Sequence, residues 1–150
     1  MEEKFLQPEE QKEERNYQLK VAFRCDLSLF LILYGGFMSS YESLKKNRDF
    51  EKVHSFGISK GNKYLVMVVL ENHLDENRLG IQVSKKVGNS VVRHRLTRLI
   101  RESYRLNSKM FNSGLDIVII ARVSAKDRTY KEIESALLHL GKIQNILKEG

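Results

Sequence analysis

The sequence predicts a mixed α/β domain whose elements follow in the order helix, strands, helix, strand, helix. Residues 85–105 and the stretch after Thr129 repeat apolar residues at the spacing of one helix face, and residues 41–56 do so over a shorter length. Between these segments lie apolar runs of strand length that are rich in β-branched residues. The runs are residues 64–70, 78–84 and 115–123.

The first helix is predicted over residues 41–56 and is closed by Gly57. Its apolar positions are Leu44, Phe50, Val53 and Phe56. The last helix is predicted to begin at Thr129, which together with Glu132 has the spacing of a capping box. One side of that helix carries Ile133, Leu137, Leu140, Ile143 and Leu147.

The three apolar runs are predicted to form one sheet. Residues 64–70 and 78–84 are separated by the turn-like "ENHLDEN", so we expect them to be adjacent antiparallel strands. Residues 115–123 are a strongly apolar run, which favours a central place in the sheet. Asp116, at the start of this run, is expected to have a turn or capping role.

Composition limits the class of partner. The chain has 150 residues, of which 41% are hydrophobic and 30% charged, as expected for one globular domain. A net charge of +7 and a pI near 9.5 favour a polyanion such as RNA, DNA or an anionic membrane over a small acidic substrate. Cys25 is the single cysteine, which excludes an internal disulfide and is typical of the reducing cytoplasm.

Charge also divides the chain. Residues 1–37 hold five Lys or Arg against seven Asp or Glu, net −2, which leaves 21 against 12 from Met38 onward, net +9. The apolar stretch at residues 27–37 is about half of the ~20 residues that a membrane-spanning helix needs, and the acidic start is unlike a signal peptide. Residues 1–37 are therefore either an extension that packs on the domain or sequence upstream of a true start at Met38. We favour the second, and expect the functional domain over residues 38–150.

The segment "KKVGNSVVRHRLTRLIRESYR", residues 85–105, contains seven Lys or Arg among its 21 residues. Projected at about 100° per residue, one side of this helix carries apolar residues and Ser103, whereas the other carries arginines. The first side is Val92, Leu96, Leu99, Ile100 and Ser103; the second is Arg98, Arg101 and Arg105, with Arg95 on the flank. We expect the apolar side to pack on the sheet and the arginines to bind phosphates, the alternative being a basic face that is merely solvated.

The turn before this helix adds to the predicted anion site. Gly88 and Asn89 permit a tight turn, and the amides of the first helical turn are expected to be free to bind an anion. Lys85 and Lys86 stand at the end of the preceding strand, beside that turn.

Together with its flanking segments, this stretch resembles the protein subunit of bacterial ribonuclease P. The resemblance rests on "VSKKVGNSVVRHRLTRLIRE", "SLKKNRDFEKV" and "DIVIIAR", and covers residues 41–147. It implies a two-layer α/β (α+β) sandwich in the order αβββαβα, with a left-handed βαβ crossover that holds the arginine helix. It also implies a cytoplasmic ribonucleoprotein in which this protein joins a catalytic RNA to remove the 5′ leader from precursor tRNA.

The resemblance implies which residues bind the RNA subunit. The family's Arg-Asn-Arg motif falls on Arg93, His94 and Arg95, so His94 stands where the family usually has Asn. Thr97-Arg98 stands where it often has Lys-Arg, which removes one basic contact. The expected contacts are Lys85, Lys86, Asn89, Arg93, His94, Arg95, Arg98, Arg101 and Arg105.

The family's cleft for the tRNA leader lies between the first helix and the sheet, and maps onto Phe50 and His54. His54 stands where the family often has Phe, and Val68 where it often has Tyr, so we expect less base stacking in this chain. Lys60, Lys63 and Tyr130 are added as candidate phosphate contacts and a stacking ring. The alternative for Phe50 is an ordinary core aromatic.

No catalytic or metal-binding set is expected in the chain. Its four His residues are scattered, without an HExxH or Cys-x-x-Cys motif. The resemblance therefore assigns the chemistry to the RNA subunit, and the Mg²⁺ requirement to the RNA-containing enzyme. Expected partners are the RNA subunit and precursor tRNA, with no membrane or small-molecule substrate. The competing hypotheses are a ribosomal or tRNA-binding structural protein and an independent nuclease.

Overall fold

The computed structural model describes residues 41–149. Residues 1–37 and the expected start at Met38 lie outside this range, so both predictions about them stay predictions. Within it, three helices and a five-stranded mixed sheet follow the order βαβββαβα. The predicted α/β class and element order are confirmed, with a short strand added before the first helix.

The sheet has the strand order β1-β4-β5-β3-β2. Its strands are β1 (Tyr41–Ser43), β2 (Ile58–Gly61), β3 (Leu65–Glu71), β4 (Asn77–Val83) and β5 (Leu115–Ala121). β5 runs parallel to β4 and antiparallel to β3, while β1 is parallel to β4 and β2 antiparallel to β3. The predicted central position of the third run is therefore correct, since β5 is the middle strand.

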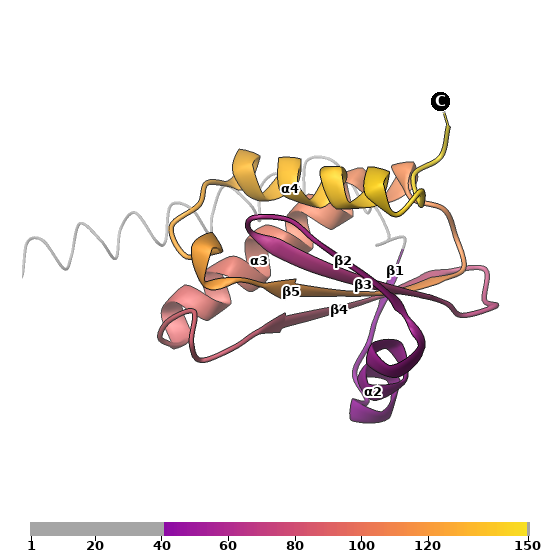
Figure 1. Cartoon of the computed structure of the whole chain (residues 1–150), viewed down its shortest axis with the longest axis horizontal. Coiled ribbons are helices and arrows are strands. Elements are labelled where there is room, and N and C mark those ends of the chain that lie inside the picture. Colours follow the sequence, from indigo (N-terminus) through magenta and orange to yellow (C-terminus); the bar gives the residue numbers. More distant parts are fainter. Residues whose placement is uncertain (1–40, 150) are drawn as a thin grey trace, which may run out of the picture. The chain divides into compact units, whose positions relative to one another are not determined.

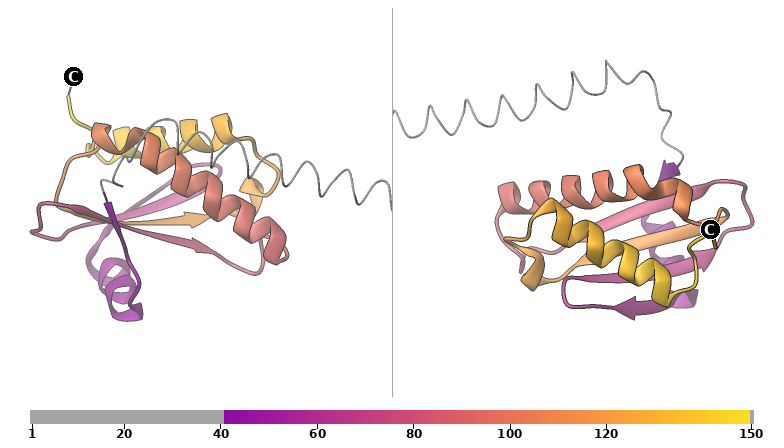
Figure 2. Two further views of the ribbon diagram at one scale, coloured as in Figure 1. Left: turned by 180° about the vertical axis from the view of Figure 1, so that it is seen from behind. Right: turned by 90° about the horizontal axis from the view of Figure 1, so that it is seen from above.

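The helices lie on both faces of the sheet (Figure 1). They are α2 (Asn47–Phe56), α3 (Ser90–Asn107) and α4 (Tyr130–Ile143). Figure 2 shows α3 and α4 side by side across one face, whereas α2 lies against one part of the other face. α3 connects the parallel strands β4 and β5; the left-handedness of this crossover stays a prediction.

Two apolar cores follow from this arrangement. The larger one fills the space between the sheet and the α3–α4 layer, and includes Met67, Ile119 and Leu137. The smaller one lies under α2 and consists of Leu44, Val53, Val68 and Val118, with Phe50, Leu70 and Ile120 partly buried around it. Because α2 is short, it leaves part of this face of the sheet uncovered.

Both long helices begin at the caps that the sequence supplies. The side chain of Asn89 accepts a hydrogen bond from the Val92 amide at 3.1 Å and so caps α3. Thr129 and Glu132 form a reciprocal capping box at the start of α4. The predicted apolar stripe of α4 is too long, because the helix ends at Ile143, which is itself exposed.

Two sequence predictions about the sheet and the first helix are wrong. β3 and β4 are not neighbours, because β5 lies between them and pairs with both. The first helix is shorter than predicted: Tyr41–Ser43 forms β1, and Leu44 is buried before α2 begins. Phe56, predicted on the apolar side, is 74% exposed.

A buried ion pair links the sheet to α2. Asp116 on β5 is 2% exposed and receives two hydrogen bonds from the guanidinium of Arg78 on β4, that from Nε measuring 2.7 Å. Asn72 donates a third bond to Asp116 at 2.9 Å, and Arg78 also reaches Asp49 on α2 at 3.4 Å. The hydrogen bond to Asp116 raises the pKa of Arg78. The expected turn or capping role of Asp116 is therefore wrong.

Candidate nucleic-acid interface

The basic face of α3 lies opposite its buried side. Leu96 and Ile100 are fully buried against the sheet, and Ser103 is buried with them. Arg98 and Arg101 are exposed on the other side, and neither makes a hydrogen bond or ion pair with another residue in the range 41–149. Two cations are thus held by a rigid helix and are available to an anionic partner.

The other predicted arginines of α3 are less free. Arg95 is exposed, but its guanidinium donates hydrogen bonds to the backbone carbonyls of Lys126 at 3.4 Å and Arg128 at 3.0 Å. Arg105 is half-buried and forms a bidentate pair with Glu102, and this hydrogen bonding raises the pKa of Arg105. Helical projection cannot detect such partners, because they come from a neighbouring loop or from a side chain that turns toward the arginine.

The remaining residues of the motif lie at the start of α3. His94 is exposed, whereas Arg93 is half-buried and its backbone carbonyl accepts a hydrogen bond from Thr97. The side-chain oxygen of Asn89 accepts a hydrogen bond from the Val92 amide, so this amide of the first turn is not available to an anion. A contact of Asn89 with RNA would therefore use its remaining side-chain donors.

Lys85 and Lys86 lie in the turn that leads from β4 to α3. Both are exposed, and the next residue, Val87, is 2% exposed in the larger core. Val87 therefore anchors the turn while the two lysines extend from it. This arrangement brings both cations to the same end of α3 as His94.

The five residues predicted for the leader cleft do not come together. Phe50 and His54 lie on α2, on the sparsely covered face of the sheet. Lys60 pairs across the strands with Met67, so its side chain points to the face that α3 and α4 cover. Lys63 lies in the turn between β2 and β3, beside α4.

Tyr130 also belongs to the α3–α4 layer. Its hydroxyl donates a hydrogen bond to Glu134 at 3.0 Å, and burial, aided by this bond, raises the pKa of Tyr130 to about 12. Glu134 in turn accepts a hydrogen bond from Asn107 at the end of α3. Tyr130 thus takes part in the contact between the two helices, on the opposite side of the sheet from Phe50.

The sparsely covered sheet face beside α2 forms a second candidate surface, here called the open sheet face. Its residues are Phe50, His54, Val66, Gln82, Ile120 and Arg122. The ring of Phe50 lies against Gly80, where an added Cβ would be 2.4 Å from Phe50 Cε1. His54 Nε2 and Gln82 Oε1 are hydrogen-bonded at 3.0 Å beside it. Val68 is buried beneath this region.

Arg122 is a residue of the open sheet face that the sequence analysis missed. It directly follows β5, is exposed, and its Nη2 lies 2.9 Å from the position that a Cβ on Gly61 would occupy. The guanidinium therefore lies against the bare backbone of Gly61. Strand alternation could have found it, because Val118, Ile120 and Arg122 share one face at intervals of two residues.

Two further kinds of feature, a metal-binding cluster and a membrane-spanning helix, are absent from the described part of the chain. Residues 41–149 contain no group of three or more His, Cys, Asp or Glu that could hold a metal ion. No helix within that same range is long and apolar enough to cross a membrane.

Comparisons with known proteins point to a single family. A family profile described as Ribonuclease P matches residues 38–144. The ribonuclease P protein component of Lachnoclostridium phytofermentans is 62% identical over 109 residues, which are 73% of this chain and 94% of that protein. The protein of the same name from Alkaliphilus metalliredigens is 56% identical over 103 residues, 69% of this chain and 93% of that protein.

Solved structures give the same result. The RNase P protein of Staphylococcus aureus matches with a TM-score of 0.66 and 38% identity, over 71% of this chain and 97% of that one. The RNase P protein of Thermotoga maritima matches with a TM-score of 0.63 and 34% identity, over 73% of this chain and 99% of that one. The chain therefore belongs to the family of bacterial ribonuclease P protein components, the protein subunits of a tRNA-processing endoribonuclease.

Proposed function

We propose that this chain binds the RNA subunit of ribonuclease P through the basic face of α3, and the 5′ leader of precursor tRNA through the open sheet face. The RNA subunit then performs the cleavage that yields the mature 5′ end. The observation that carries the proposal is the division of α3, which buries Leu96 and Ile100 while presenting Arg98 and Arg101 unpaired among the described residues. Unpaired, exposed arginines on a rigid helix are suited to phosphate oxygens.

The proposed leader contact uses two ends of the open sheet face. At one end the half-buried ring of Phe50 offers a surface on which a base can stack. At the other end the exposed guanidinium of Arg122 can pair with a phosphate. Such contacts do not require a particular base, which suits leaders of different sequence.

The Mg²⁺ that cleavage requires is assigned to the RNA subunit. Residues 41–149 offer no cluster of carboxylates for a two-metal site. The cations of the protein would neutralise phosphates that otherwise need Mg²⁺, so the protein lowers the Mg²⁺ concentration at which the RNA works.

A processing assay tests this function with the full chain. Precursor tRNA is incubated at low Mg²⁺ with protein alone, with RNA subunit alone, and with both. We expect no cleavage with protein alone and stimulated 5′ cleavage with both. Cleavage by RNA-free protein would indicate an independent nuclease, whereas binding without stimulation would indicate a structural RNA-binding protein.

If α3 binds the RNA subunit, replacing its exposed arginines should weaken RNA binding without changing the stability of the fold. Arg98→Ala and Arg101→Ala should each make log K against log[salt] for RNA-subunit binding shallower by about 0.7–0.9, because one phosphate contact is lost. The free energy of unfolding should change by no more than about 0.5 kcal/mol, since both side chains are exposed. Salt titrations and thermal melts measure the two effects.

Arg48→Ala is the matched control, because Arg48 is an exposed arginine on α2, across the sheet from α3. It should leave the salt dependence of RNA-subunit binding unchanged. If Arg98→Ala and Arg101→Ala behave like Arg48→Ala, the basic face of α3 is only solvated and the RNA subunit binds elsewhere.

A further inference from the structure

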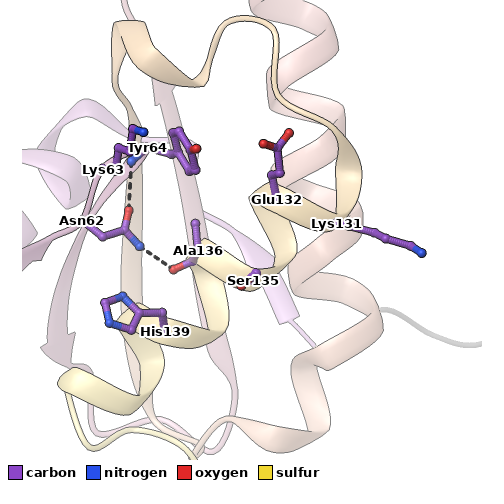
Figure 3. A pocket seen from close by; sticks show the side chains of 8 residues that line it. All are labelled: Asn62, Lys63, Tyr64, Lys131, Glu132, Ser135, Ala136 and His139. Carbon is purple, nitrogen blue, oxygen red and sulfur yellow. Dashed lines mark hydrogen bonds between the residues drawn. The ribbon is translucent and has the colours of Figure 1, made fainter.

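A shallow pocket of about 490 Å³ lies between the β2–β3 turn and the first half of α4 (Figure 3). The turn contributes Asn62, Lys63 and Tyr64, and the helix contributes Glu132, Ala136 and His139. Asn62 fixes the turn in place, because its amide donates to the Ala136 carbonyl at 2.8 Å and its oxygen accepts from the Tyr64 amide at 3.1 Å. The pocket is therefore a formed feature of the α4 side of the sheet.

Two cations flank the ring of Tyr64. Lys63 Nζ lies 5.6 Å from the ring centroid and Arg128 Cζ lies 5.5 Å from it, both within the range of a cation–π contact. Lys63 has no ion pair among the described residues, and Arg128 pairs with Glu132 at 3.3 Å where both side chains are more than one-third exposed. Such an exposed pair is weak and leaves Arg128 able to meet another anion.

This pair of cations is joined to the basic face of α3 by one loop. The Ser124 hydroxyl donates a hydrogen bond to the Lys63 carbonyl, and Arg95 on α3 donates to the carbonyls of Lys126 and Arg128. The loop is thus held from both sides. Its exposed Lys126 continues the row of positive charge between α3 and the pocket.

The surface that runs from α3 across residues 126–128 to the pocket, here called the strip, carries more cations than acidic groups. Asp127 is exposed in the loop, and Glu132 accepts hydrogen bonds from the Thr129 amide and from Arg128. Against these stand the cations Lys63, Arg95, Lys126, Arg128 and Lys131. The strip therefore keeps a positive balance.

We propose that the backbone of the RNA subunit continues from α3 across the 126–128 loop and is held a second time by Lys63 and Arg128 beside Tyr64. The inference rests on the proposed function and extends it to a contact on the β2–β3 turn and α4. In this arrangement Arg95 is a positioning residue: its guanidinium holds the loop that presents Arg128. The RNA subunit is the partner, because the 126–128 loop links the pocket to the basic face of α3, and the pocket lies across the sheet from the open sheet face.

The test measures RNA-subunit affinity of the full chain as a function of salt. Lys63→Ala and Arg128→Ala should each weaken binding and make the slope of log K against log[salt] shallower by about 0.7–0.9. Lys142→Ala is the control, since Lys142 is an exposed lysine at the far end of α4. It should leave the slope unchanged.

Arg95→Lys tests the positioning role. Lysine keeps the positive charge but lacks the planar guanidinium that donates to two carbonyls. The slope of log K against log[salt] should therefore become shallower, as for Lys63→Ala, although the net charge of the protein is unchanged. A slope equal to that of the wild type would show that Arg95 acts only through its charge and would overturn this part of the proposal. Thermal melts confirm that each variant is folded.

Arg98→Ala serves as the reference for the α3 interface. If it weakens binding while Lys63→Ala and Arg128→Ala match Lys142→Ala, the second contact is wrong and the proposed function stands. If Arg98→Ala also has no effect, the α3 interface fails together with its extension. A loss of precursor-tRNA affinity by the assembled enzyme, with RNA-subunit affinity unchanged, would assign the pocket to tRNA and overturn the inference.

Discussion

Replacement of Arg78 by Met is expected to lower the free energy of unfolding by about 3–5 kcal/mol, because it leaves the carboxylate of Asp116 buried without its cation. The side chain of Asp116 is 3% exposed, and Arg78 supplies two of the three hydrogen bonds that it receives from other side chains. Methionine retains much of the length and apolar surface of the arginine stem, so the loss reflects the ion pair. Urea unfolding monitored by circular dichroism measures the difference.

The matched control for this change is Arg128→Met. Arg128 also pairs with a carboxylate, but both side chains of its pair with Glu132 are more than one-third exposed, so the loss of this pair should cost much less stability than the loss of Arg78. The double change Arg78→Met with Asp116→Leu should recover most of the lost stability, because no buried charge remains. A cost below about 1 kcal/mol for Arg78→Met would show that Asp116 tolerates the loss of its partner.

Gly80→Ala is expected to lower the free energy of unfolding by about 1–3 kcal/mol and to weaken leader binding. The new Cβ would lie 2.4 Å from Cε1 and 2.8 Å from Cζ of Phe50, which is closer than carbon atoms approach, so the ring and α2 must move. If Phe50 stacks on a leader base, the assembled enzyme should lose about 1–3 kcal/mol of affinity for precursor tRNA. Binding of mature tRNA, which has no leader, should be nearly unchanged.

Phe50→Leu separates the two effects of Gly80→Ala. Leucine removes the ring but keeps an apolar contact, so Phe50→Leu should weaken precursor-tRNA binding with a smaller loss of stability. Combining it with Gly80→Ala should cost less stability than the sum of the two single changes, since the atoms that clash are gone. Equal weakening of precursor and mature tRNA binding would instead identify Phe50 as an ordinary core aromatic.

The sequence was informative where the physical cause is local. The cap of α3 was not predicted, because the amides of its first turn were expected to be free, whereas the side chain of Asn89 accepts a hydrogen bond from one of them. The capping box of α4 is formed by two residues that are three positions apart, so their spacing alone predicts it. The buried side of α3 follows from helical geometry in the same way. The first helix was predicted too long, because Leu44 is buried by the sheet and not by helical periodicity.

Pairings between distant segments could not be predicted from the same patterns. β3 and β4 look like a hairpin because a short turn separates them, yet β5 pairs with both through contacts that no local pattern contains. The position of Tyr130 depends on which face of the sheet α4 covers, and the partners of Arg95 are carbonyls more than 30 residues away. A resemblance to a family indicates which residues of the chain occupy the positions of a known site. It does not show which of these side chains already have hydrogen-bond partners within the protein.

The central place of β5 also determines when the sheet can form during synthesis. Until residues 115–121 have left the ribosome, β4 has only the short β1 as a partner and β3 only β2, so the two halves of the sheet remain separate. Each half then exposes an unpaired apolar edge, which is the kind of surface that associates with other chains. A nascent chain released before Leu115 therefore lacks the strand that joins its halves, and we expect such fragments to aggregate or to be degraded instead of folding.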